Sequence, residues 1–320
     1  MGIALPMEVT KTAPPHDLWA VAAYFNPSGF RRRLANYRTF RSRLDVPLAT
    51  VELSFGKPFE LSAGDADILI QIRDGDVMWQ KERLLNLAVA ALPADCTKVA
   101  ILDCDLVFGS PDWAQRTSAA LDEVPLLQPF SHAYRTPPGW TADGLADPGD
   151  YVLHAAAWLI ESGMTVDDAL RGIGNDIGCA HGLAWAARRE LLAEHGLYDA
   201  SIVGGGDTCL FRAAYGYMGL VVERFRLDRP HARHYRDWAE PFYAAVGGKV
   251  GYAAGHLYHL WHGSVDDRRY MERHETLAGF AFHPREDVAL SDSGAWRWNT
   301  AKDDMHRYLQ SYFGSRNEDG

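Results

Sequence analysis

Two aspartates separated by a single residue are the first candidates for chemistry in this chain. Asp103 and Asp105 lie within residues 98–108, KVAILDCDLVF, directly after four consecutive apolar residues. Carboxylates placed side by side repel one another, and removing them from water is unfavourable unless a cation is present. Hard divalent cations such as Mn²⁺ or Mg²⁺ prefer oxygen ligands of this kind. The pattern therefore predicts a divalent-cation site at this point of the chain.

The element that must position the pair is the apolar run itself. It shows no polar alternation, which indicates a strand buried on both faces. If the backbone stays extended past the run, Asp103 and Asp105 project to one side and Cys104 to the other. Open α/β sheets bind their ligands at the carboxyl ends of such strands. We therefore expect the aspartate pair at the ligand-binding edge of a sheet.

The first 130 residues alternate between strand and helix patterns. Strands are expected at 18–25, 49–55 (nearer an edge), 66–73, the central run and 125–130, and helices at 29–44, at 77–92 and after Ser110, taken as an N-cap. This alternation indicates a parallel, doubly wound sheet. The chain has no GxGxxG after its first strand and no GxxxxGK[ST], so dinucleotide-binding and P-loop functions lose most of their support.

The second part of the chain is less regular. Residues 131–150 are rich in Pro, Gly and Asp and suggest a lid or binding loop. Helices are expected at 151–162, 188–196, from Asp207 onward, at 231–246 and at 303–313, and strands at 182–187 and 219–227. Trp296 and Trp298 are expected on one face of a short element. The stretch 172–182 is glycine-rich.

Composition limits the partners and the compartment. The chain of 320 residues is 47% hydrophobic and carries a formal charge of −10, so it has no general electrostatic footprint for nucleic acid. Four cysteines without CxxC spacing suit a reducing cytoplasm. No secretory leader and no membrane span are expected from the apolar pattern. We therefore expect a cytoplasmic protein with a substantial core.

Four motifs in order resemble a known enzyme family. They are Asp103-Cys104-Asp105 closing a buried strand, GLAWA at 182–186, Gly204-Gly205-Gly206-Asp207 opening a helix, and Trp261-His262-Gly263. This set resembles the metal-dependent glycosyltransferases of GT-A fold over residues 18–275. Its layout is closest to the β-1,4-galactosyltransferases and the galactosyltransferase-like lobe of polypeptide GalNAc-transferases. The resemblance implies one compact α/β catalytic domain with a mixed, mostly parallel sheet flanked by helices.

The resemblance also implies roles for individual residues. Asp105 would ligate Mn²⁺ directly, and Asp103 would contact the nucleotide ribose or the water shell of the metal. His262 would complete the metal site, with His259 as the alternative. Asp207 matches the carboxylate that deprotonates the acceptor hydroxyl in inverting members. Gly206 stands where the family often has an acidic residue, which leaves the anchoring of the acceptor open.

Further residues are assigned to the two substrate sides. The nucleotide-sugar side is expected to include Asn26, Pro27, Arg31, Arg73 and Lys81, and the acceptor side Trp185, Gly205 and Gly206. Each has a simpler interpretation. Asp207 also fits a helix N-cap, Trp185 a core residue, and Lys81 a solvated helix turn. Six arginines between 31 and 43 also fit a solvated helix face.

By this resemblance the chain divides into four parts. Residues 1–17 form a lead-in, 18–180 the nucleotide-sugar-binding half, 181–280 the acceptor-side half and 281–320 a helical extension.

The predicted function is inverting transfer of a sugar from a nucleotide-diphosphate sugar, with a UDP-sugar favoured, to an acceptor hydroxyl. A divalent cation neutralises the leaving diphosphate, and a base takes the proton of the hydroxyl. The alternatives are a sugar nucleotidyltransferase and a nucleotide-sugar-binding protein without turnover. The acceptor is open among a glycan, a metabolite, a protein and a nucleobase in DNA, and the oligomeric state is also open.

Overall fold

The computed structural model describes residues 17–143, 152–172 and 178–320. The expected lead-in therefore lies almost entirely outside the described residues. The glycine-rich stretch 172–182 and the proposed lid 131–150 are each described only in part.

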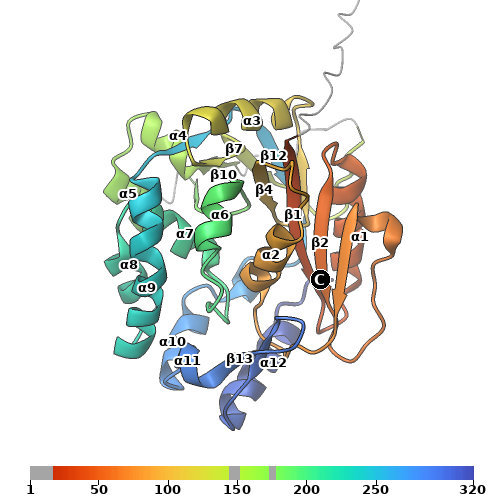
Figure 1. Ribbon diagram of the computed structural model, residues 1–320. Coiled ribbons are helices and arrows are strands. Elements are labelled where there is room, and N and C mark those ends of the chain that lie inside the picture. Colours follow the sequence, from red (N-terminus) through yellow and green to blue (C-terminus); the bar gives the residue numbers. More distant parts are fainter. Residues whose placement is uncertain (1–16, 144–151, 173–177) are drawn as a thin grey trace, which may run out of the picture.

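A seven-stranded sheet forms the centre of the molecule (Figure 1). Its order is β11-β6-β10-β4-β1-β2-β3, and every strand runs parallel except β10. The strands are β1 (Leu18–Phe25), β2 (Leu48–Leu53), β3 (Ile68–Ile72), β4 (Lys98–Leu102), β6 (Leu126–Gln128), β10 (Ala184–Arg188) and β11 (Val250–Tyr252). The predicted mixed, mostly parallel sheet is confirmed.

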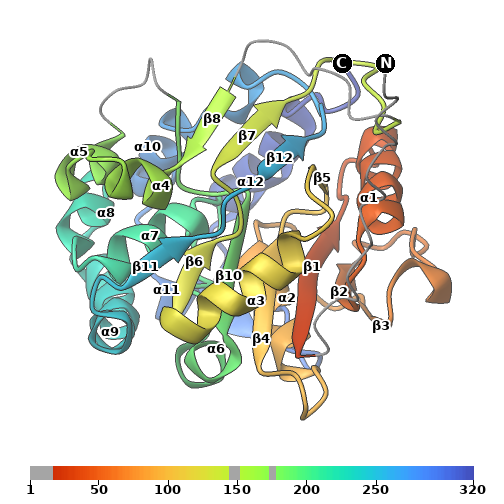
Figure 2. The same ribbon diagram turned by 90° about the horizontal axis from the view of Figure 1, so that it is seen from above.

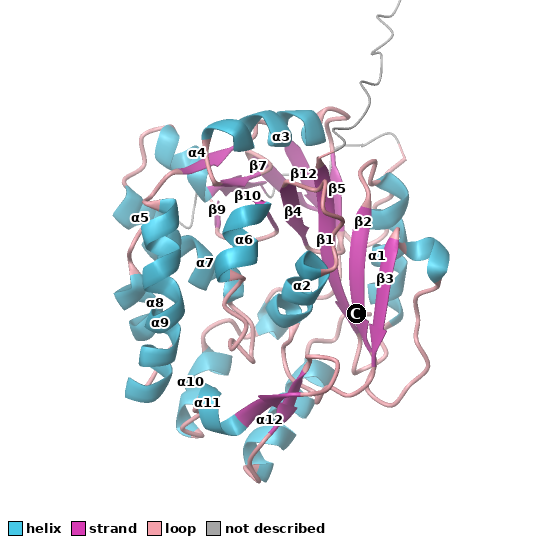
Figure 3. Ribbon diagram, viewed as in Figure 1, coloured by secondary structure: helices cyan, strands magenta, loops and turns pink. Residues whose placement is uncertain are grey.

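Helices cover both faces of this sheet (Figure 3). One face packs against α2 (Lys81–Ala90) and α6 (Arg189–His195), with α7 (Gly206–Ala214) and α9 (Arg229–Val246) extending the same core. The other face packs against α1 (Arg31–Arg43) and α3 (Trp113–Glu123). Alternate residues of β1 serve the two cores: Val21 belongs to the first, and Ala20 and Ala22 to the second. Burial on both faces explains the apolar runs of β1 and β4.

A second sheet lies beside the central one, and Figure 2 shows its strands β7, β8 and β12 next to each other. Its order is β5 (Leu106–Phe108), β12 (His256–His259), β7 (His132–Arg135), β8 (Val152–Ala155), β9 (Cys179–Ala180). The run 98–108 is thus two strands in two sheets. Residues 103–105 form the turn between them, so the backbone does not stay extended at the aspartate pair.

The C-terminal part adds a hairpin and helices at the foot of the molecule, shown in blue in Figure 1. These elements are α10 (Glu272–Gly279), α11 (Pro284–Asp287), β13 (Val288–Leu290), β14 (Trp296–Trp298) and α12 (Asp303–Ser315). They share a third core with Met78, Ile202 and Val203, which joins them to the loops that lead into α2 and α7. Trp296 and Trp298 are two residues apart on β14, as their predicted shared face requires.

Several predicted elements are wrong. Residues 219–227 form most of α8 (Met218–Arg224), a helix, because the tertiary contacts of this segment override its β-branched composition. Val221 is buried in the main core, and the Leu220 carbonyl accepts a hydrogen bond of 2.7 Å from Arg212. The predicted loop 131–150 contains β7, and the predicted helix 151–162 is β8 followed by α4 (Ala156–Glu161).

One detail of the predicted α/β half also differs: Asp112, not Ser110, occupies the N-cap position of α3. β2 is buried along its whole length and lies next to the edge strand β3, which agrees with its predicted place nearer an edge.

All four cysteines are free. None of the helices in the described ranges combines the length and the hydropathy that crossing a bilayer requires.

Candidate active site

A cavity of about 530 Å³ opens at the carboxyl ends of β1 and β4. Asp103 and Asp105, in the turn after β4, line it. So do Asp207 from α7 and His262 from the loop after β12. The structure therefore brings together four residues that the sequence pattern singled out, from three distant parts of the chain.

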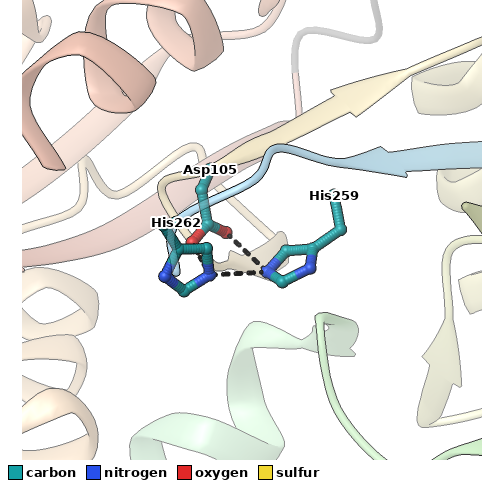
Figure 4. Close-up of side chains that lie close together, drawn as sticks. All are labelled: Asp105, His259 and His262. Atoms are coloured by element: carbon teal, nitrogen blue, oxygen red, sulfur yellow. Dashed lines mark hydrogen bonds and ion pairs between the residues drawn. The ribbon is translucent and has the colours of Figure 1, made fainter. Parts of the chain in front are cut away.

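Asp105, His259 and His262 converge on one point of this cavity (Figure 4). His262 Nε2 lies 3.1 Å from Asp105 Oδ2, and His259 Nε2 lies 3.6 Å from Asp105 Oδ1. The two Nε2 atoms are 3.0 Å apart. Pairing of β12 with β5 places His259 opposite Leu106, and the Leu260 N–H donates to the Asp105 carbonyl at 2.8 Å. The strand ladder therefore sets the positions of the carboxylate and of the His259 ring, and the loop that follows β12 brings in His262.

This cluster fits a divalent cation. Asp105 Oδ1 is buried and has no hydrogen-bond partner in the described part of the chain. Burial lowers the pKa of His262 well below its ordinary value, against the effect of Asp105, and Arg268 lowers it further. A neutral imidazole has a nitrogen lone pair for a metal. Two imidazoles and one carboxylate form a set of ligands that suits a transition metal such as Mn²⁺ better than Mg²⁺.

Lys81 links the other two aspartates. Its Nζ lies 2.5 Å from Asp103 Oδ1 and 3.1 Å from Asp207 Oδ2. Lys81 is the first residue of α2, and its side chain is 12% exposed, so it is not a solvated helix turn. Burial raises the pKa of Asp103 to about 6, because the charge of Lys81 only partly offsets the loss of solvent.

Asp207 is not the N-cap of its helix. α7 begins at Gly206, and Gly205 holds the N-cap position with a φ of 98°, which favours glycine. The Asp207 side chain points instead to Lys81 and packs against Gly182, where a Cβ would lie 2.8 Å from Asp207 Oδ2. A side chain at 182 would displace this carboxylate, so the position requires glycine. The glycine-rich run at 172–182 is visible in the sequence, but it predicts no role for Gly182.

Glu82 lies behind the cavity wall next to the start of α7, and sequence patterns did not reveal this position. A Cβ at Gly206 would collide with its carboxyl group, so Glu82 occupies the space of a side chain at 206. The residue is 5% exposed. Burial raises the pKa of its carboxyl to about 8, although Lys81 acts in the opposite direction.

Three arginines beside the metal-type cluster surround one buried carboxylate. Glu318 accepts two hydrogen bonds from Arg33, at 2.5 and 2.9 Å, and one from Arg316 at 2.6 Å. Arg268 lies 3.6 Å from the same carboxylate, and its Nη2 is 2.5 Å from both the carbonyl oxygen and Nδ1 of His262. All four charged residues line the cavity. This group leaves an excess of positive charge next to His262.

Other predicted site residues lie away from the cavity. Trp185 is 1% exposed in the main core, where its Nε1 donates to the His181 carbonyl, so it does not line an acceptor site. Asn26 bonds to Glu60 and to the Phe30 backbone in the turn before α1.

The two arginines assigned to the nucleotide-sugar side also lie away from the cavity. The side chain of Arg31 is 95% exposed and pairs with Asp319. Arg73 stacks over Phe59. Of the residues assigned to the nucleotide side, Lys81, Asp103 and Asp105 lie at the cavity, whereas Pro27, like Asn26, Arg31 and Arg73, is not among its lining residues.

These features define an α/β protein with a metal-type cluster and a lysine-bridged aspartate pair in one cavity. No family model matches the chain, and no curated protein matches its sequence. Among solved structures it is similar to glucosyl-3-phosphoglycerate synthase from Mycobacterium tuberculosis in complex with Mn²⁺, UDP and glucosyl-3-phosphoglycerate. The identity is 14%, the TM-score is 0.42, and the match covers 88% of this chain and 87% of that one.

A second similar structure is S. aureus TarS 1-349 in complex with UDP. The identity is 11%, the TM-score is 0.36, and the match covers 71% of this chain and 70% of that one. Both likenesses are low in identity and in TM-score. The narrower resemblance to β-1,4-galactosyltransferases and polypeptide GalNAc-transferases stays a prediction.

Proposed function

We propose that this chain is a metal-dependent glycosyltransferase that moves a sugar from a nucleotide-diphosphate sugar to an acceptor hydroxyl with inversion. One observation carries the proposal. The Asp105–His259–His262 cluster and the Asp207 carboxylate line the same cavity at the end of β4. The cluster suits a cation at the leaving group, and the carboxylate suits a base at the attacking oxygen.

Asp105, His259 and His262 would hold the divalent cation. When bound, that cation neutralises the diphosphate that leaves the sugar. Arg268 lies next to His262, and Arg268 and Arg316 share the Glu318 carboxylate with Arg33, so in this part of the described chain the guanidinium groups outnumber the carboxylate and can bind the same phosphates. Asp103 would face the nucleotide, with Lys81 setting the direction of its carboxylate.

Asp207 is the proposed base. Lys81 and Gly182 hold its side chain from two sides, which fixes the direction in which it can accept a proton. The acceptor hydroxyl donates its proton to Asp207 while its oxygen forms the bond to the anomeric carbon. The bond from that carbon to the diphosphate oxygen breaks on the opposite face. A base on one side and a leaving group on the other invert the configuration.

The N-terminus of α1 bears on the competing nucleotidyltransferase function. Such an enzyme would bind a triphosphate in the loop after its first strand. Here Asp319 occupies the first turn of α1 and accepts hydrogen bonds from the N–H groups of Arg31 and Arg32, at 3.2 and 2.8 Å. This arrangement favours the transferase.

The test is release of UDP from a panel of UDP-sugars with Mn²⁺ and a broad panel of acceptors. Asp207→Asn should keep donor binding and lower the transfer rate roughly a hundredfold or more. Asp167→Asn, at an exposed aspartate of α5 (Val166–Arg171), is the matched control and should transfer normally. Nucleotide binding without UDP release would support a non-catalytic binding protein. A requirement for a nucleoside triphosphate would support the nucleotidyltransferase.

A further inference from the structure

Two buried N–H groups beside Gly204 have no acceptor in the described part of the chain. They are Nε of Arg273 and Nε1 of Trp79, and both residues line the cavity. Arg273 Nη2 and the Trp79 ring both pack against Gly204, where a Cβ would lie 3.3 and 3.4 Å from them. Buried donors normally have partners, and leaving one unpaired is unfavourable by about 1–3 kcal/mol. A ligand atom is the partner that this arrangement lacks.

Arg273 also lacks a counter-ion among the described residues. It is 5% exposed, and its Nη1 donates to the Tyr312 hydroxyl at 2.7 Å. Its guanidinium lies over the Tyr270 ring at 5.0 Å, and within the described ranges it makes no ion pair with a carboxylate. A buried charge without compensation is strongly destabilising. A neutral side chain of the same size would destabilise the fold less, so the buried charge indicates that a ligand binds here.

The unpaired donors lie on the side of the proposed base. Gly204 precedes Asp207 by three residues, and Gly205 packs on Phe225 and His274. Arg224, directly before Phe225, also lines the cavity and is exposed. Burial lowers the pKa of His274, and Arg273 and then Arg224 lower it further, in keeping with a positive potential here.

The charges of the cavity point the same way. Of the described residues that line it, seven are arginine or lysine and four are aspartate or glutamate, although the whole chain carries −10. A nucleotide-diphosphate sugar brings one negative charge for each phosphate, and a divalent cation cancels both. Donor and metal together therefore leave the surplus of positive charge unchanged. A positive potential in the cavity favours the binding of a second anion.

We propose that the acceptor is itself an anion, with a phosphate or carboxylate group bound by Arg273 and Trp79 Nε1 beside Asp207, and with Arg224 at the entrance. The role of this anion as the acceptor rests on the proposed function, whereas the anion site itself rests on the unpaired donors. A guanidinium and an indole N–H suit either group. The acceptor hydroxyl would then lie within reach of Asp207 while its anionic end is held beneath Gly204.

The binding experiment uses the full chain and inorganic phosphate, titrated by calorimetry with and without saturating UDP and Mg²⁺ at constant ionic strength. Wild type should bind phosphate in both conditions. Arg273→Met should weaken binding at least tenfold, and Trp79→Phe, which keeps the ring but removes the N–H, should weaken it severalfold. The matched control is Arg226→Gln, since Arg226 is exposed, pairs with Glu275 and does not line the cavity.

Thermal unfolding distinguishes a ligand-binding role of Arg273 from a purely structural one. Removing an uncompensated buried charge should leave the melting temperature of the ligand-free Arg273→Met protein unchanged or higher. A lower melting temperature together with unchanged phosphate affinity would make Arg273 a structural residue and overturn the proposal. If wild type binds malonate but not phosphate, the group is a carboxylate. Binding of neither anion also overturns it.

Turnover separates this inference from the proposed function. Glucose 6-phosphate, glucuronate and glucose differ only at C6, which carries a phosphate ester, a carboxylate and a neutral hydroxymethyl group, so they form a matched acceptor series. Preference for a charged member that Arg273→Met abolishes, with the KM for the donor unchanged, supports the anionic acceptor. Phosphate binding at Arg273 without any UDP–metal binding would remove the glycosyltransferase function and keep the anion site. Efficient transfer to glucose but to neither charged member would support the glycosyltransferase function and overturn the anionic acceptor.

Discussion

The carboxyl group of Glu82 fills the space that a side chain at Gly206 would need. The two residues belong to different helices, α2 and α7, and Asp207 follows directly in the chain. An acidic group therefore lies next to the proposed base, although position 206 itself is a glycine. Glu82 does not line the cavity, so its effect on the site passes through Lys81 and the start of α7.

Gly206→Ala should destabilise the protein by about 1–3 kcal/mol, because the new methyl group overlaps the Glu82 carboxyl. Chemical denaturation measures the change. The double variant Gly206→Ala, Glu82→Ala removes the overlap and should be more stable than the sum of its single effects predicts. Gly279→Ala is the control, since a Cβ there meets nothing within 4 Å. If the effects of the two substitutions on the free energy of unfolding simply add, the two side chains do not meet.

Glu82→Gln should change how stability depends on pH. Burial raises the pKa of Glu82 from 4.5 to about 8, so between these values the folded chain holds a proton that the unfolded chain has lost. The contribution of Glu82 to the free energy of unfolding is therefore fully present below pH 4.5 and is lost as the pH rises to about 8. The Gln variant lacks this decline and should gain on wild type by on the order of 1 kcal/mol or more by pH 8.

Denaturant unfolding at a series of pH values measures this difference. Glu240→Gln, at an exposed position of α9, should give a curve parallel to that of wild type. If the Glu82→Gln curve is also parallel to wild type, the carboxyl of Glu82 is ionised in the folded protein.

The parts of the fold that patterns predict well are those where burial is uniform. β1 and β4 are apolar runs between turn signals, and Arg31–Arg43 has apolar residues at helical spacing, so local sequence decides them. Residues 219–227 were misassigned because their β-branched residues favour a strand, while contacts with α7 and α9 make them helical.

The site also has residues that local sequence predicts and residues that only the tertiary structure reveals. Asp103, Asp105, Asp207 and His262 could be selected from motifs, since each follows a recognisable strand or glycine signal. The partners of these residues could not. Lys81 meets Asp207 across 126 positions of the chain, and no local pattern records a contact of that length. Glu82, Gly182, Arg273 and Glu318 join the site for the same reason, through packing alone.

The metal assignment predicts Mn²⁺ binding without any nucleotide. Asp105→Asn, His259→Ala and His262→Ala should each lower Mn²⁺ affinity at least tenfold, because each removes one of three converging ligands. Calorimetry with Mn²⁺ alone measures the loss. His256→Ala, exposed at the start of the same strand β12, is the control and should bind normally. Full affinity in His259→Ala would reduce the cluster to Asp105 and His262.

Lys81→Met should affect stability and transfer together. The change leaves Asp103 and Asp207 without the cation that lies between them. Complete loss of a buried partner is worth about 3–5 kcal/mol, and these carboxylates are 27% and 31% exposed, so about 1–3 kcal/mol is expected. Chemical denaturation measures this loss, and exposed Lys249→Met is the control.

Adding Asp207→Asn to Lys81→Met removes one of the two unpaired charges. The double variant should therefore recover part of the lost stability while remaining inactive in transfer. If the second substitution instead lowers stability further by its full single-variant amount, Lys81 and Asp207 do not interact in solution. In that case the lysine belongs to Asp103 alone, and the orientation of the base depends on Gly182 and the start of α7.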